Sequence, residues 1–239
     1  AIPHPLWSRG LGDVYKRQDY SSSEGREDPD TRRAHRPKKT SVKAFLEQIP
    51  ARLRPTIQRF TTDMWDGYLT AATEFIAAHD DVTAYVVIDR FHVAKQYRDA
   101  FDKLRKQELK RLKQDLSDET YTADCKGMLW ILRKNHAALT PSERIRLRRL
   151  LGHSSQLHQA YTLREELTAL FNQAQTTQHA ERWLLAWIEK VVHSDVRCFD
   201  KFLNTLRNHW PSILNYFCDR VTSGFVEGLN NKIKTLILL

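Results

Sequence analysis

The spacing of apolar positions between residues 41 and 93 predicts a helix, a strand, a second helix and a second strand. Residues 41–54 carry apolar side chains at helical spacing up to Pro50, which stops the helix. Residues 56–64 and 81–93 are rich in β-branched and aromatic side chains, which favours strands, and residues 65–79 return to helical spacing. This order predicts a parallel βαβ unit. The apolar face of the first helix consists of Val42, Phe45, Leu46 and Ile49.

Helical spacing continues from residue 94 to about residue 216. Ser117 and Thr140 are predicted to start helices, and Thr140 begins a capping box of the form S/T-x-x-E followed by Pro141. The helix DKFLNTLRNHW is predicted to end before Pro211. The predicted apolar faces are Tyr97, Phe101, Leu104 and Leu112 on the long first helix, and Trp183, Leu184, Trp187, Ile188 and Val191 on a later one.

Residues 1–39 lack apolar periodicity and are rich in Pro, Gly, Ser and mixed charge. This composition buries too little apolar surface to offset chain entropy, so the segment is expected to be disordered. Within it, SRGLGDVYKRQ (residues 8–18) resembles the translation of a sequencing-library adaptor, and the alternative is a genuine flexible arm. We therefore expect a fragment whose own N-terminus has been replaced by foreign sequence.

The fold class expected from these patterns is α/β with dominant helix. The chain divides into a disordered segment (1–39), an α/β core (40–93), a helical insertion (94–216) and a terminal helix (217–239). The 239 residues include 38 Lys and Arg against 29 Asp and Glu, a net charge of +9, which favours a polyanion as partner. The sequence contains no run of about 18 apolar residues that would indicate a membrane span, so a cytoplasmic protein is expected.

The three cysteines are Cys125, Cys198 and Cys218, and no two of them form a CxxC pair. An odd number of cysteines without such a pair argues against a disulfide framework and against a metal site built on thiols. We expect a reducing compartment, in which these side chains serve as small buried apolar groups.

Both predicted strands end in an acid, Asp63 in TTDMW and Asp89 in VIDRFH. The carboxyl ends of parallel strands form the ligand side of an open sheet, and carboxylates there suit a divalent cation such as magnesium. The alternative is that each Asp caps the helix that follows it. A third acid lies in SGFVEGLNNKIK, where Glu227, Asn230, Asn231 and Lys234 form a polar stripe opposite an apolar helix face, with a solvated surface as the alternative.

Positive charge is concentrated on the long helix. Between residues 91 and 113 there are eight Lys or Arg and three acids, which favours contacts with phosphates, although a solvated helix face would carry similar charge. The candidate DNA-binding residues are Arg90, Lys95, Arg105, Lys106, Lys110, Arg111, Lys232 and Lys234.

The blocks TTDMWDGY, VVIDRFHVAKQYRDAFDKLRKQELKRLK and SGFVEGLNNKIK resemble transposases of bacterial insertion sequences in the ISL-three family of the DDE class. The resemblance covers residues 39–234 and implies metal-dependent DNA strand cleavage and strand transfer. It also implies a partial RNase H-like domain in which two Asp and one Glu hold two Mg²⁺ ions, interrupted by a helical insertion. Transposon ends and target DNA are the implied partners, and the intact transposase is expected to form a homo-oligomer.

On this resemblance Asp63 matches the second catalytic and metal-binding acid, and Glu227 matches the final one. Asp89, His92, Asn230 and Asn231 are adjacent to the site, and the reverse assignment, with Asp89 catalytic and Asp63 structural, remains open.

The first catalytic Asp of the family lies on the opening strand, and no strand-borne Asp precedes residue 40 in this chain. The expectation is therefore a transposase fragment that binds DNA weakly and does not cut it. The rival interpretation is a non-enzymatic, basic helical module that binds nucleic acid through RKQELKRLK and RIRLRRLL.

Overall fold

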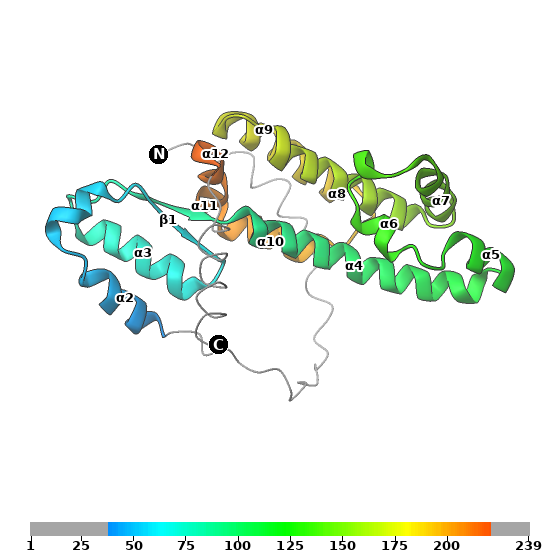
Figure 1. Cartoon of the computed structure of the whole chain (residues 1–239), viewed down its shortest axis with the longest axis horizontal. Coiled ribbons are helices and arrows are strands. Elements are labelled where there is room, and N and C mark those ends of the chain that lie inside the picture. Colours follow the sequence, from blue (N-terminus) through cyan, green and yellow to red (C-terminus); the bar gives the residue numbers. More distant parts are fainter. Residues whose placement is uncertain (1–37, 221–239) are drawn as a thin grey trace, which may run out of the picture. The chain divides into compact units, whose positions relative to one another are not determined.

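The computed structural model describes residues 38–220, which form two compact units (Figure 1). The α/β unit consists of residues 38–93 and 208–220, and the helical unit of residues 94–207. The described residues are mostly helical and contain one two-stranded sheet, which confirms an α/β fold dominated by helix. Residues 1–37 and 221–239 lie outside the described part, and with them the segment predicted to be disordered and the terminal helix.

The α/β unit follows the predicted order of helix, strand, helix and strand. Its elements are α2 (Lys39–Glu47), the short 3-10 helix η1 (Ala51–Thr56), β1 (Arg59–Thr62), α3 (Asp66–Ala78) and β2 (Tyr85–Ile88), joined later by α11 (Trp210–Leu214) and α12 (Tyr216–Asp219). Each strand is shorter than predicted because only four residues of each pair with the other. Residues 51–56, part of which was assigned to the first strand, instead form η1.

The two strands are parallel, and α3 connects them as the predicted crossover helix. The register pairs Arg59 with Tyr85 and Thr62 with Ile88. Phe60 on β1 meets Phe75 on α3 edge to face, with ring centres 5.9 Å apart. This contact shows which face of the sheet α3 covers.

Helix α2 packs against α3, and the two lie side by side in Figure 1. Leu46 is buried in their shared core, and Val42 and Ile49 are partly buried beside it. The prediction for Phe45 was wrong, because its side chain is 67% exposed. Positions 42, 46 and 49 form one narrow stripe at about 100° per residue, and Phe45 lies at the margin of that stripe.

The C-terminal helices of the α/β unit attach to the strands by polar contacts. Asn215 donates a hydrogen bond through Nδ2 to the backbone carbonyl of Val86, at 2.9 Å. Asp219 on α12 accepts hydrogen bonds from Arg59 and from the Tyr85 hydroxyl, both at 2.6 Å. The hydrogen bond to Asp219 raises the pKa of Tyr85 above its ordinary value. These contacts join residues that are more than 120 positions apart in the sequence.

The long helix α4 (Arg90–Asp115) starts in the α/β unit and continues into the helical unit. The other elements of the helical unit are α5 (Asp118–Asp124), α6 (Leu129–Arg133), the 3-10 helix η2 (His136–Ala138), α7 (Pro141–Gly152), α8 (Ser155–Gln173), α9 (Thr177–His193) and α10 (Asp200–Asn208). Helices α8 and α9 pack against each other and are drawn next to each other in Figure 1. Residues 94–207 are thus helical throughout, apart from short connections, as predicted.

The predicted helix starts are confirmed by their capping bonds. Ser117 accepts a hydrogen bond from the N–H of Thr120 and begins α5. Thr140 and Glu143 form the complete capping box, with Pro141 in the first turn of α7. Helix α10 ends at Asn208, before Pro211, as expected. These start and stop signals are local, which is why they could be identified from the sequence alone.

The core of the helical unit contains most of the side chains predicted for it. Tyr97, Phe101 and Leu112 of α4 are buried, as are Leu184, Trp187, Ile188 and Val191 of α9. Trp187 also donates a hydrogen bond through Nε1 to the carbonyl of Leu163, at 2.8 Å. The prediction for Trp183 was wrong: its side chain is 36% exposed and packs against His179 on the same helix.

The cysteines divide by burial. Cys125 is buried and Cys198 is half-buried, and burial raises the pKa of the Cys198 thiol to about 12. Cys218 is exposed, so the expectation that all three serve as buried apolar groups was wrong for it. None of the three forms a disulfide in the described part of the chain.

Candidate active site

Asp63 and Asp89 follow the two parallel strands directly and lie at the same end of the sheet. The last paired positions are Thr62 and Ile88, and the N–H of Asp89 donates to the carbonyl of Thr62 at 3.0 Å. Since neighbouring strands are about 4.8 Å apart, the two acids occupy adjacent backbone positions. This end of the sheet, with Asp63 and Asp89, is called the acidic edge below. As predicted, both strands therefore end in an acid at the same end of the sheet.

Asp63 is held by the loop that follows it. Its Oδ1 accepts a hydrogen bond from the N–H of Trp65 at 2.9 Å. Helix α3 begins only at Asp66, and Trp65 occupies its N-cap position, so Asp63 orders the loop and does not cap the helix. Its side chain is half-buried. Asp63 is thus fixed in place and still partly accessible.

The loop beside Asp63 depends on a close contact between Trp65 and Gly67. A Cβ atom added at Gly67 would lie 2.3 Å from the Trp65 ring, and the same ring meets Tyr68 edge to face with centres 4.7 Å apart. The tryptophan therefore folds back over the first turn of α3, where only glycine leaves room for it.

Replacing Gly67 by alanine is expected to lower the free energy of unfolding by about 1 to 2 kcal/mol, because the Trp65 ring must move away. Thermal unfolding followed by circular dichroism measures this loss. Gly152→Ala is the matched control, since a Cβ there meets nothing within 4 Å. An equal melting temperature for Gly67→Ala and the unmodified chain would contradict this account of the loop.

Asp89 has a different environment from Asp63. Its side chain is only 1% exposed, and its Oδ1 accepts a hydrogen bond from the N–H of Phe91 at 2.8 Å. Because α4 begins at Arg90, Asp89 occupies the N-cap position of α4, and the capping contact considered as an alternative is present here. His92 is half-buried, and its ring meets that of Phe91 edge to face at 5.5 Å.

The donor atoms at the acidic edge are carboxylate oxygens, the ligands that Mg²⁺ prefers. Among residues 38–220, no group of three or more His, Cys, Asp or Glu side chains is arranged to hold a metal ion. Glu227, Asn230, Asn231, Lys232 and Lys234 lie outside the described residues, so their positions relative to Asp63 stay predictions. The described residues thus place two carboxylates, of Asp63 and Asp89, at this end of the sheet.

The candidate DNA-binding residues of α4 differ in how much of their charge is available. Lys95 and Lys110 are exposed, and Lys106 is exposed although its Nζ lies 3.3 Å from Asp102. Arg105 is only 9% exposed and its Nε donates to Asp102 at 2.8 Å, which leaves little of its charge for a phosphate. Arg90 is half-buried. The periodicity of the sequence did not reveal that Arg105 faces inward.

Arg111 is half-exposed and contacts two acids, Glu108 at 2.8 Å and Asp115 at 2.7 Å. These ion pairs raise the pKa of its guanidinium and offset its charge. The strongest remaining positive surface of α4 is therefore formed by its exposed lysines and by Arg98.

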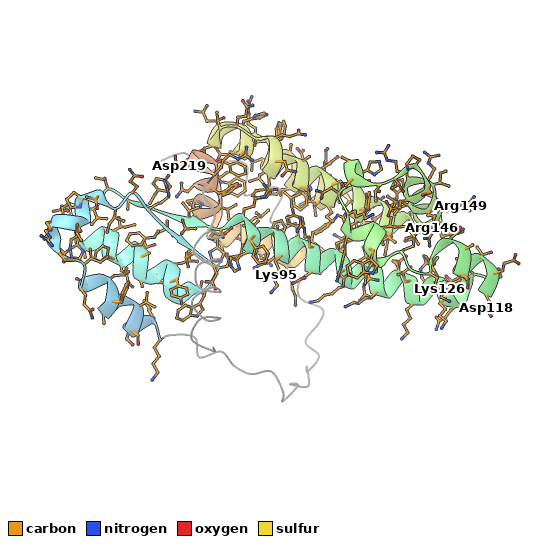
Figure 2. All side chains as sticks on the ribbon, viewed as in Figure 1. Lys95, Asp118, Lys126, Arg146, Arg149 and Asp219 are labelled. Carbon is orange, nitrogen blue, oxygen red and sulfur yellow. The ribbon has the colours of Figure 1, made fainter. Side chains whose placement is uncertain are left out.

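A second basic cluster lies on the helical unit. Figure 2 shows Lys126, Arg146 and Arg149 close together over the connection after α5 and on α7. Arg146 donates to the backbone carbonyl of Lys126 at 2.7 Å, and Arg149 lies 3.8 Å from Asp124. The run RIRLRRLL supplies two members of this cluster, but Lys126 carried no signal in the sequence.

The helical unit also has a groove of about 650 Å³ between α7 and α8. Leu147, Leu151 and Tyr161 contribute its apolar surface, Arg144 and Arg148 line it from α7, and Glu165 and Glu166 line it from α8. Cations on one wall and acids on the other do not favour binding of a polyanion. Of the segments predicted to bind nucleic acid, only the run RIRLRRLL of the rival interpretation lines this groove.

Comparison with known proteins identifies the family. Residues 33–237 match the transposase family of the DDE class named for ISL3. This chain belongs to that transposase family. The transposase for insertion sequence element IS1001 of Bordetella parapertussis is 28% identical over 197 residues. The match covers 82% of this chain and 46% of that protein, so this transposase chain spans about half the length of its relative.

No solved structure matches this transposase chain. In its described part, no helix is both long and apolar enough to span a membrane. The family match includes the three blocks that carry the resemblance, TTDMWDGY, VIDRFH and SGFVEGLNNKIK.

Proposed function

We propose that this chain contributes the metal-binding acids of a transposase that cleaves DNA strands and joins them during transposition of an insertion sequence. The observation that carries the proposal is the adjacent position of Asp63 and Asp89 at the carboxyl ends of two parallel strands. In an open α/β sheet this edge is the usual ligand site. Membership of the DDE transposase family supports the same chemistry.

Within this proposal Asp63 is the metal ligand and Asp89 has a supporting role. Asp63 is half-buried and its Oδ1 is oriented by the Trp65 N–H, so it is both fixed and reachable by a phosphate. Asp89 is 1% exposed and caps α4. A ligand to a metal that also contacts DNA must reach solvent, which favours Asp63 over the reverse assignment.

The place of Asp219 is compatible with Glu227 as a second ligand. Alternation along the strands places Arg59 and Asp63 on one face of β1, and Asp219 is bound to Arg59 on that face. Arg59 and Asp63 are four residues apart, about 13 Å along a strand. Helix α12 ends at Asp219, and the eight residues from Asp219 to Glu227 can span up to about 26 Å when extended. The chain after Asp219 is therefore long enough to bring Glu227 to the acidic edge.

The proposed fold around this site is a partial RNase H-like core that is interrupted, between β2 and the Glu227 segment, by the helical unit. Bound Mg²⁺ would activate the attacking water or 3′ hydroxyl and stabilise the leaving oxygen. Asp63 and Glu227 would hold it, and the exposed lysines of α4 and the cluster of Lys126, Arg146 and Arg149 would bind DNA phosphates. Transposon ends and target DNA are the proposed partners, with a homo-oligomer as the assembled form.

A titration of the purified chain with Mn²⁺, used in place of Mg²⁺ and followed by calorimetry, tests this proposal. Asp63→Asn is expected to weaken Mn²⁺ binding about tenfold or more, because a carboxylate ligand is lost. Glu227→Gln is expected to weaken it to a similar extent. Asp66→Asn, which removes an exposed carboxylate three residues from Asp63, is the matched control and is expected to bind as the unmodified chain does.

Each variant decides between the alternatives. Loss of binding in Asp89→Asn with normal binding in Asp63→Asn would transfer the ligand role to Asp89 and keep the metal site. If Mn²⁺ binds with the same affinity to Asp63→Asn, Asp89→Asn and Glu227→Gln as to the unmodified chain, the proposed metal site is contradicted. DNA binding in that case would favour the non-enzymatic basic module.

A further inference from the structure

Phe91 presents an exposed aromatic ring beside the acidic edge. Its side chain is 58% exposed, although the strand before it and Val93 and Ala94 after it are buried. A single exposed aromatic side chain is ordinary on a protein surface. Phe91 is distinguished by its place, because its N–H is bound to the Asp89 carboxylate at 2.8 Å. Its ring is also supported from the side by His92, with the two planes at 85°.

Two cations share the face of α4 on which Phe91 lies. Lys95 and Arg98 follow Phe91 at i+4 and i+7, which is one stripe along a helix. Both side chains are exposed, and within residues 38–220 neither takes part in an ion pair. Figure 2 labels Lys95 on α4, one turn after Phe91. An aromatic ring followed by two available cations is the combination that binds single-stranded nucleic acid.

We propose that Phe91 stacks on an unpaired DNA base at the acidic edge, while Lys95 and Arg98 bind the phosphates of the same strand. This inference rests on the proposed function, since it gives the DNA strand a position next to Asp63 and Asp89. The partner is single-stranded DNA or the frayed end of a duplex, because a base inside a duplex has no free face for the ring. Phe91 is a positioning residue: it holds the base and takes no part in bond making.

A fluorescence titration with a single-stranded oligonucleotide tests the stacking. One base of the oligonucleotide is 2-aminopurine, whose fluorescence falls when the base stacks on an aromatic ring, and the buffer contains EDTA. The unmodified chain is expected to quench this signal on binding. Phe91→Leu keeps an apolar side chain but removes the ring face, and it is expected to lose the quenching and to weaken binding about tenfold. Phe91→Trp is expected to restore both.

Phe45→Leu is the matched control. Phe45 lies in the same unit, on α2, and is 67% exposed, so its replacement removes a comparable exposed ring away from the acidic edge. It is expected to leave quenching and affinity unchanged. Lys95→Gln and Arg98→Gln are each expected to reduce the salt dependence of log K by about one unit of slope while quenching at saturation persists.

Three results would overturn the proposal: no quenching by the unmodified chain, unchanged quenching by Phe91→Leu, or an equal loss in Phe45→Leu. Since the titration contains EDTA, it does not depend on a metal site. Failure of Mn²⁺ binding with intact quenching would count against the proposed catalytic site alone. Normal Mn²⁺ binding without quenching would count against the role of Phe91 alone.

Discussion

Replacing Arg164 by leucine is expected to lower the free energy of unfolding of the helical unit by about 3 to 5 kcal/mol. Arg164 is 5% exposed, and its guanidinium lies 4.7 Å from the ring centres of both Phe101 and Tyr161. It donates to the backbone carbonyl of Leu132 and, at 2.6 Å, to the carboxylate of Glu165. Leucine cannot donate to that carbonyl, which would remain buried without its partner.

The contacts of Arg164 connect three segments of the helical unit. α4 supplies Phe101, α8 supplies Tyr161 and Arg164, and the end of α6 supplies the carbonyl of Leu132. Burial around this cluster also raises the pKa of Tyr161 to about 12. Removing the guanidinium therefore affects the contacts of several helices, which is why the expected loss is large.

Urea unfolding followed by far-ultraviolet circular dichroism measures the effect. Arg148→Leu, on the exposed side of α7, is the control and is expected to change the unfolding free energy by less than about 0.5 kcal/mol. Arg164→Lys keeps the charge but lacks the planar group that contacts two rings, so an intermediate loss is expected. A loss below about 1 kcal/mol in Arg164→Leu would show that the guanidinium is not needed for these contacts.

Replacing Glu108 by glutamine is expected to lower the unfolding free energy at pH 7 by about 1.5 to 3 kcal/mol and to reduce its loss in acid. Glu108 is 8% exposed, accepts from Arg111 Nη2 at 2.8 Å and from the Ser154 hydroxyl at 2.5 Å. Ser154 in turn caps α8 by accepting from the N–H of Leu157. These bonds, that to Arg111 above all, hold the pKa of Glu108 below its ordinary value.

The direction of the pH effect follows from that lowered pKa. The folded protein keeps Glu108 ionised at a pH where the unfolded chain, with a pKa of about 4.3, already binds a proton. The stabilisation is therefore complete above the unfolded pKa and is lost as the pH falls through the folded value. Unfolding free energies measured between about pH 3 and pH 7 are expected to fall less steeply in Glu108→Gln than in the unmodified chain.

Some loss of unfolding free energy in acid is expected to remain in Glu108→Gln, because Arg105 lowers the pKa of Asp102 in the same way. Glu119→Gln, an exposed carboxylate in the first turn of α5, is the control and is expected to keep the full pH dependence. Identical slopes in Glu108→Gln and the unmodified chain would contradict the role of Glu108 in acid unfolding.

Most of the secondary structure could be predicted because its signals are local. The capping box at Thr140 and the Pro211 stop each depend on residues within one helical turn. The position of Asp63 and Asp89 at one end of the sheet was also predictable. Two strands joined by a crossover helix are parallel, so the residues that follow them lie at the same end of the sheet.

The errors arose where a helix has two neighbouring faces of similar hydrophobicity. Phe45 and Trp183 each lie beside an apolar stripe and remain exposed, since the packed face of each helix is narrower than its apolar positions suggest. Arg105 was placed among the DNA-binding residues by its charge, but Asp102 pairs with it where the helix is buried. The periodicity of a helix does not show which neighbouring element will cover it, and that element decides which of its faces is buried.

The order of the elements, the parallel strand pair with its two acids and, through three sequence blocks, the transposase family could all be read from the amino-acid sequence. Which polar groups are buried together depends instead on the tertiary fold. Asp219 binds Arg59 across 160 positions, and Arg164 lies between two aromatic rings. Local propensity acts over a few neighbouring residues. The burial of a charge depends on segments that are distant in the sequence and come together only in the folded chain, and a single sequence carries no signal for those contacts.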